Sequence, residues 1–282
     1  MLPDYLYHYT TKESVLSILK NKTIRFRRLD ALNDLIEGCC KKYAPMKKYV
    51  FISSWCADKR ESIPMWSMYG QKGNISDEGV RIKVPSNIFT KDSNGNMKSE
   101  LCLKKILGKW NVVNDVETKK IEIAEVTKHL LKNVDESSDL FSKKEVVGPV
   151  KVEYIPVDEY LEKYGSPSIV KKSNNYDSYS FYFEEIGHEK VDDWSYENEY
   201  RFWMTYPYVK EIRGELGFLE QDVSFTVRDY IDVYYNEKAI AEMEILLGPN
   251  FNSDKESQFR EDLMALGFTK ELQRSRLQVR LE

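Results

Sequence analysis

Residues 6–19 have the sequence LYHYTTKESVLSIL, and no other stretch says more about the fold. The apolar and aromatic residues over 6–9 predict a short strand. Thr10 and Glu13 have the spacing of a helix capping box. The apolar positions within 15–19 then fall on one face of a helix. The sequence therefore predicts a strand that leads directly into a helix capped by Thr10.

His8 lies at the end of that predicted strand, just before the helix. Free backbone N–H groups and the helix dipole attract anionic ligand groups to such a position. His8, Tyr9 and Thr10 are therefore a candidate binding element. The alternative is structural, because a lone histidine beside tyrosine is commonly a satisfied core residue and Thr10 already has a capping role.

The remaining elements occur in mixed order, without a regular βαβ alternation. Strands are expected at 23–28, 49–55, 80–84 (half-buried), 150–155, 196–206, 223–227, 243–247 and 277–281, and helices at 106–134, 176–190 and 253–266. This order favours an α+β fold over a doubly wound one. No repeat and no Pro- or Ser-rich linker is present, so residues 1–282 are expected to form one domain with a mixed, mostly antiparallel sheet.

The composition is that of an ordinary globular protein, with 41% hydrophobic and 31% charged residues. The formal net charge is −4, whereas a dedicated nucleic-acid binder usually carries a basic excess. The best candidate for a local basic surface lies within residues 20–28, at Lys20, Lys22, Arg25, Arg27 and Arg28. A solvated surface is the alternative for this stretch.

The cysteine and histidine spacing favours a reduced, metal-free protein. The adjacent Cys39 and Cys40 make a poor disulfide and lack C-x-x-C spacing, and the three histidines are far apart in sequence. No signal peptide and no apolar run long enough to span a bilayer is evident. A cytoplasmic location without membrane attachment is therefore expected.

A second candidate element is the segment WSYENEYRF at 194–202. On a strand of period two, Glu197, Glu199 and Arg201 share one face. Charged residues are depleted in strands, so this face suggests a carboxylate that Arg201 holds ionised and oriented. The alternative is a solvated sheet face with an Arg–Glu pair.

Three further polar and aromatic residues are candidates for a ligand wall. Ser54 lies near the end of the strand predicted at 49–55, and Trp66 and Tyr69 are spaced to share one face of a helical turn. Packing in the core is the alternative for the two aromatic rings. The sequence has no G-x-S-x-G elbow, P-loop, G-x-G-x-x-G or H-E-x-x-H motif.

Together these motifs resemble a widespread bacterial family of unknown function, over almost the whole chain. The resemblance is carried by LYHYT at 6–10, SVLSIL at 14–19, Asn33-Asp34-x-x-Glu37, Met65-Trp66-x-x-Tyr69, Trp194-x-Tyr196-Glu197-x-Glu199-x-Arg201 and Leu247-Gly248-Pro249. The usual Asn-Asp-Pro of that family is Asn33-Asp34-Leu35 here, so the local turn is expected to differ. Helix capping is the alternative role for this polar group.

The strand with His-x-Thr and the following helix are also similar to the opening of DarT-like DNA ADP-ribosyltransferases and RNA 2′-phosphotransferases. The helix match is partial. ADP-ribosyltransferases place a His or Arg, then a Tyr or Ser, then a catalytic Glu in chain order. The corresponding order here is His8, then Ser54 or Tyr69, then Glu197 or Glu199. This resemblance implies a split sheet and NAD as substrate, with no metal.

The same resemblance implies a role for each candidate residue. Glu199 would be the first choice as catalytic residue and Glu197 would face the acceptor, with His8 at the ribose hydroxyls. Arg201 would contact phosphate or orient a carboxylate. The expected cofactor-binding residues are His8, Tyr9 and Tyr69 (the two tyrosines stacking on nicotinamide), Thr10, Ser54, Trp66 and Arg201.

The expected function is therefore an NAD-dependent ADP-ribosyltransferase or NAD glycohydrolase, as a toxin or phage-defence effector. The acceptor would be a nucleic acid, a protein or water, and an antitoxin or neighbouring defence protein is the expected partner. Two alternatives stay open. One is a non-catalytic nucleotide or nucleic-acid binding module on the same fold. The other is a metal-dependent nuclease that uses Asp34, Glu37 and the Glu197/Glu199 pair.

Overall fold

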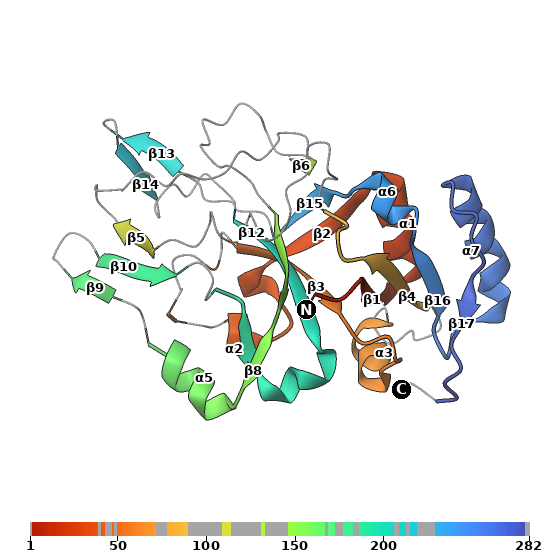
Figure 1. Ribbon diagram of the computed structural model, residues 1–282, viewed down its shortest axis with the longest axis horizontal. Helices are drawn as coiled ribbons and strands as arrows, with labels where there is room; N and C mark the ends of the chain where they lie inside the picture. The colour runs from red at the N-terminus through yellow and green to blue at the C-terminus, as the bar shows by residue number, and fades with distance from the viewer. Residues whose placement is uncertain are drawn as a thin grey trace.

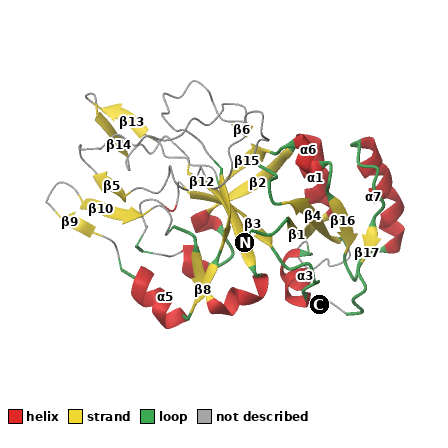
Figure 2. Ribbon diagram, viewed as in Figure 1, coloured by secondary structure: helices red, strands yellow, loops and turns green. Residues whose placement is uncertain are grey.

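A computed structural model describes residues 2–38, 41–42, 47, 50–71, 78–89, 109–113, 131–132, 146–166, 169–172, 177–182, 186–205, 209–212, 215–218 and 229–279. It has an α+β fold with a mostly antiparallel open sheet (Figures 1 and 2). In chain order the elements are β1 (Tyr5–Thr11), α1 (Lys12–Asn21), β2 (Thr23–Arg28), η1 (Leu29–Ala31), α2 (Leu35–Gly38), β3 (Val50–Cys56), α3 (Ile63–Tyr69), β4 (Gly79–Pro85), β5 (Lys109–Val113), β6 (Leu131–Lys132), β7 (Val147–Lys151), β8 (Glu153–Ile155), α5 (Val157–Tyr164), β9 (Ile169–Lys172), β10 (Asp177–Tyr182), β11 (Glu189–Val191), η5 (Asp192–Glu197), β12 (Glu199–Thr205), β13 (Val209–Ile212), β14 (Glu215–Phe218), β15 (Tyr230–Tyr234), α6 (Glu237–Ile240), β16 (Glu244–Leu247), α7 (Ser253–Ala265) and β17 (Gln273–Arg274).

The largest sheet has ten of the described strands, in the order β17-β16-β4-β1-β3-β2-β15-β6, with β12 paired to β3 and β7. β1 pairs with β4 along its whole length, from Tyr5 opposite Pro85 to Thr11 opposite Gly79. Helix α7 lies at one end of the molecule beside β17, while the small sheets of β5, β9 and β10 and of β13 and β14 lie at the other end (Figure 1).

Strand β3 forks this sheet. Its last residue, Cys56, pairs with Tyr7 of β1, whereas its beginning pairs with β2 through Ile52 opposite Arg27. Along the other edge of β3, β12 pairs continuously with residues 50–56. The strands β1 and β2 therefore separate beside residues 53–55, and β12 supports the sheet behind that opening.

Strand β4 is more buried than the half-buried strand expected over 80–84, and of its residues Lys83 alone is partly exposed. Val80, Ile82 and Val84 are fully buried on one side. On the other side Arg81 is also buried, with its guanidinium 4.7 Å above the ring of Tyr7. Aromatic rings thus cover the Arg81 side of β4, which the alternating sequence pattern predicted to be exposed to solvent.

Several elements follow the sequence pattern closely. The predicted strands at 23–28 and 243–247 and the helix at 253–266 correspond to β2, β16 and α7. The cap of α7 is Asn252, whose side chain accepts a hydrogen bond from the backbone N–H of Asp254 at 2.8 Å. For these three elements, the local pattern of apolar residues was sufficient to predict the type and the approximate bounds.

The helices predicted at 106–134 and 176–190 were wrong wherever these residues are described. Residues 109–113 and 131–132 form β5 and β6, and residues 177–182 form β10. Within β10, residues 178–181 (SYSF) alternate small polar and aromatic residues with period two, which suits a strand better than a helix. The predicted strand at 223–227 lies outside the described residues.

The final strand also differs from the prediction. The closing strand is β17 at Gln273–Arg274, parallel to β16, and residues 277–279 form no strand. The predicted strand at 150–155 is divided between β7 and β8. Among the described residues, no helix combines the length and the apolar character needed to cross a bilayer.

Candidate functional site

A cavity of about 600 Å³ opens at the fork of the sheet. Residues from β1, β2, β3 and β12 line it, together with side chains from α1, α3 and β11. The two sequence elements that are far apart in the chain therefore meet there. His8 lies on one wall, and Glu197 and Glu199 lie on another.

Arg201 is the centre of a buried ionic network behind this cavity. Its side chain is 1% exposed, and its guanidinium bridges Glu37 and Glu199 with two hydrogen bonds to each carboxylate. Nε lies 2.7 Å from Oε1 of Glu199, and Nη1 also donates to the carbonyl of Gly187 at 2.7 Å. All five N–H groups are thereby used, so Arg201 orients a carboxylate and has no free donor for a ligand phosphate.

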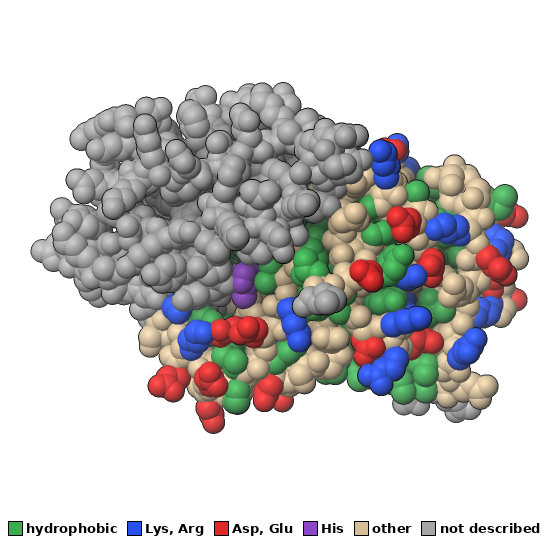
Figure 3. Space-filling view, in the orientation of Figure 1, with side chains coloured by type: hydrophobic (Ala, Val, Ile, Leu, Met, Phe, Trp, Pro, Cys, Tyr) green, Lys and Arg blue, Asp and Glu red, His purple; other side chains and the backbone are tan. Residues whose placement is uncertain are grey.

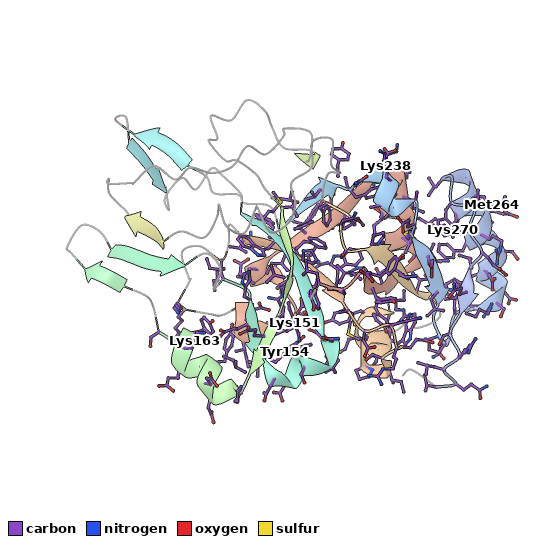
Figure 4. The ribbon with its side chains drawn as sticks, viewed as in Figure 1. Lys151, Tyr154, Lys163, Lys238, Met264 and Lys270 are labelled. Carbon is purple, nitrogen blue, oxygen red and sulfur yellow. The ribbon has the colours of Figure 1, made fainter. Side chains whose placement is uncertain are left out.

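Glu199 is held as a carboxylate, although it is buried. Burial alone would raise its pKa, but the charges of Arg201 and Lys190 and a hydrogen bond from the Ser54 side chain lower that pKa to about 2. Its backbone N–H donates to the hydroxyl of Tyr154 at 2.9 Å (labelled in Figure 4). Glu199 therefore presents a fixed negative charge to the cavity.

Glu197 does not lie on the strand that carries Glu199, so the expected shared strand face was wrong for this residue. It ends the 3-10 helix η5, and Asn198 follows in the left-handed region with φ of 42°. Asparagine tolerates this conformation better than most residues. The turn breaks the period of two, yet Glu197 still reaches the cavity beside Glu199.

Lys190 of β11 joins the two carboxylates, and no sequence motif indicated this residue. Its Nζ lies 2.6 Å from Oε2 of Glu197 and 3.6 Å from Oε2 of Glu199, and 4.3 Å above the ring of Trp194. The side chain is buried. A single cation thus offsets the repulsion between two neighbouring acids.

Tyr69 completes the other side of Glu197. Its hydroxyl donates to Oε1 of Glu197 and accepts from the side-chain amide of Asn33 at 3.0 Å. Burial and the neighbouring Glu199 charge raise the pKa of Glu197, against the effect of Lys190. Burial and the charge of Glu197 likewise raise the pKa of the Tyr69 phenol. Glu197 is therefore a better proton acceptor than Glu199.

His8 stands in the middle of β1, not at the end of the strand as expected. Its Nδ1 lies 3.0 Å from the carbonyl oxygen of Ser54, so Nδ1 carries the proton and Nε2 is an acceptor. Burial lowers the pKa of His8, which keeps the ring neutral. Thr10 lies within β1 and lines the cavity, while the helix cap is Thr11, which makes no side-chain capping hydrogen bond.

Tyr9 and Trp66 belong mainly to the core, which opposes a stacking role for them. The Tyr9 ring is 3% exposed and packs edge-on against Trp66 at 4.8 Å, and its hydroxyl accepts from the backbone N–H of Ser62. Trp66 is fully buried and does not line the cavity. Tyr69 is the one of these three rings that remains available to a flat ligand group.

The polar group at 33–37 has structural tasks. Asp34 caps α2 through hydrogen bonds from the backbone N–H groups of Ile36 and Glu37, and Glu37 pairs with Arg201. In the described part of the chain, no three His, Cys, Asp or Glu side chains form a metal-binding group. Of the cysteines, Cys56 is described; it is free, and burial raises the pKa of its thiol to about 11.

The basic stretch at 20–28 is largely neutralised by acidic neighbours. Lys22 pairs with Glu237, and Arg25 forms two hydrogen bonds to Asp232. Arg28 pairs with Asp30 and Asp229. On the face shown in Figure 3, the acidic and basic side chains of the described residues are interspersed. These pairings weaken the case for a nucleic-acid surface at this stretch.

Comparisons of the chain with protein-family models, with curated proteins and with solved structures give no match. The interpretation of the site therefore depends on its own geometry and chemistry.

Proposed function

We propose that this protein cleaves the nicotinamide–ribose bond of NAD, as an ADP-ribosyltransferase or an NAD glycohydrolase. The observation that carries the proposal is the cavity at the sheet fork, where Glu199 is fixed as an ion beside the more basic Glu197. Buried ionisable groups with opposite pKa shifts in one cavity are typical of catalytic sites.

Glu199 suits the stabilisation of a developing positive charge. Departure of nicotinamide with the bonding electrons leaves an oxocarbenium-like ribose. Arg201 holds the Glu199 carboxylate in place through two hydrogen bonds, so it need not reorient during the reaction. Because Glu37 fixes Arg201 from the other side, the orientation is set before the substrate binds.

Glu197 suits activation of the acceptor. The acceptor attacks the anomeric carbon, forms the new bond and transfers its proton to Glu197. Each oxygen of Glu197 already accepts one hydrogen bond, from Tyr69 or Lys190, and retains a second lone pair. Water as acceptor gives NAD hydrolysis, and another nucleophile gives ADP-ribosyl transfer.

His8 and Tyr69 suit the positioning of the substrate. The unprotonated Nε2 of His8 is an acceptor for a ribose hydroxyl, and the neutral state of the ring keeps it so. The ring of Tyr69 lines the cavity and offers an apolar face to nicotinamide. Ser54 and Thr10 supply further polar contacts in the same cavity.

The test is release of nicotinamide from NAD by the purified protein. Glu199→Gln and the double variant Glu197→Gln/Glu199→Gln are expected to lose the activity while retaining NAD binding. Glu244→Gln is the matched control, because Glu244 pairs with Lys83 outside the cavity. Full nicotinamide release by the double variant, or absence of NAD binding by the folded wild-type protein, would reject the proposal.

A further inference from the structure

We infer that Arg27 binds the phosphate groups of the ligand in this cavity, so the ligand is a phosphorylated nucleotide and not a free nucleoside. This inference rests on the proposed function, since it assigns a further contact within the same cavity. The inference assigns the phosphate contact to Arg27 of β2. Arg201 of β12, which was expected to contact phosphate or orient a carboxylate, keeps the second role alone.

Arg27 lies on the polar face of β2 and lines the cavity. Ile24 and Phe26 are buried on one face of the strand. Arg25 and Arg27 lie on the other face, where both are exposed and line the cavity. Arg27 is the first residue of β2 to pair with β3, opposite Ile52, so it stands where the sheet divides.

The charges that line the cavity leave Arg27 without a counter-ion. Arg25 is paired with Asp232, Lys190 with Glu197, and Arg201 with Glu199. Among the described residues, no carboxylate pairs with Arg27. Arg201 has a second carboxylate partner in Glu37, behind the cavity. Of the four cations that line the cavity, Arg27 is therefore the one that no carboxylate of the described residues pairs.

This arrangement gives the cavity two chemically different parts. On β3, Cys56 pairs with Glu199 and Ile52 pairs with Arg27. These two positions of β3 are four residues apart, or roughly 13 Å along the strand. Long Arg and Glu side chains reach into the space between these backbone positions. A ribose with its phosphates can bridge it, with the anomeric carbon near Glu199 and the phosphates near Arg27. A planar guanidinium binds phosphate oxygens through paired hydrogen bonds.

The test is calorimetric binding of ADP, NAD and nicotinamide riboside to wild-type protein, Arg27→Gln and Lys20→Gln. Lys20 is the matched control, because its exposed side chain on α1 carries the same charge and lies outside the cavity. Arg27→Gln is expected to weaken the binding of ADP and of NAD about tenfold or more. The affinity of the variant for both ligands is also expected to depend less on salt concentration than that of the wild type. Binding of nicotinamide riboside, which lacks phosphate, is expected to be unchanged in both variants.

Unchanged ADP binding by Arg27→Gln would overturn the inference, and so would an equal loss of nicotinamide riboside binding. If wild-type protein binds ADP through Arg27 but releases no nicotinamide from NAD, the inference stands and the proposed function fails. If wild-type protein releases nicotinamide from NAD and Arg27→Gln has an unchanged KM for NAD, the proposed function stands and the inference fails. Wild-type protein that binds neither ADP nor NAD would overturn both.

Discussion

Replacement of Arg201 by Met is expected to destabilise the protein by about 3–5 kcal/mol at pH 7. The substitution removes the cation from two buried carboxylates, Glu37 and Glu199, and leaves the Gly187 carbonyl without its donor. Arg201 and Lys190 lower the pKa of Glu199 from 4.5 to about 2 in the native protein. At about 1.4 kcal/mol per pKa unit, this net lowering corresponds to roughly 3–4 kcal/mol. The charge of Arg201 is the largest of its causes.

The pH dependence makes this prediction specific. In wild-type protein the contribution of Glu199 is complete above pH 4.5 and is lost as the pH falls towards 2, because the native state holds the carboxylate ionised. Burial already raises the pKa of Glu37 in the wild type, against the effect of Arg201. In Arg201→Met that opposing effect is lost, and burial raises the native-state pKa of both Glu37 and Glu199 above their unfolded values. Their protonation then stabilises the variant as the pH falls. The deficit relative to wild type is therefore expected to be largest at pH 7 and smaller at pH 5.

Urea unfolding of both proteins at pH 7 and pH 5 provides the measurement. Arg25→Met is the control, because the Arg25–Asp232 pair is partly exposed and its loss is expected to cost less than about 1 kcal/mol. A loss below 1 kcal/mol for Arg201→Met at pH 7, or a deficit independent of pH, would refute the buried network as a source of stability.

Three smaller predictions concern residues of the largest sheet. Tyr9→Phe leaves the backbone N–H of Ser62 without its acceptor and is expected to lower stability by about 1–2 kcal/mol in thermal melts; an unchanged melting temperature would contradict this. Gly79→Ala places a Cβ atom 2.4 Å from the Gly70 carbonyl oxygen and is expected to lower the melting temperature clearly, whereas a neutral effect would show that the backbone there can move freely. The Cys56 thiol, with a pKa of about 11, is expected to react with iodoacetamide at pH 8 much more slowly than it does in urea, and equal rates would argue against its burial.

The sequence predicted those parts of the site that depend on local periodicity. The strand around His8, the helix after it and the alternation of β2 follow from neighbouring residues, so they were visible without the structure. The pairing of His8 with Ser54 joins residues 46 positions apart. Such a contact is set by strand register, which no local pattern specifies.

The region around Glu197 shows why the remainder was not predictable. An unbroken alternation over 196–206 indicated one strand, but Asn198 turns into the left-handed region and moves Glu197 onto η5. The partner that makes this position tolerable is Lys190, from a segment expected to be helical. The strand pattern of the local sequence is weak compared with a buried ion pair, so tertiary contacts decided the local structure.

The fork of the sheet has a consequence for how substitutions in this protein are interpreted. The Ser54 carbonyl faces the opening, where His8 binds it. In an antiparallel ladder the N–H and C=O of one residue point to the same edge, so the Ser54 amide N–H faces the opening as well. A ligand that enters there meets main-chain groups that every amino acid except proline carries. Alanine scanning would therefore miss such contacts, and sequence divergence at Ser54 would leave them intact, whereas an amide-to-ester replacement in the backbone would reveal them.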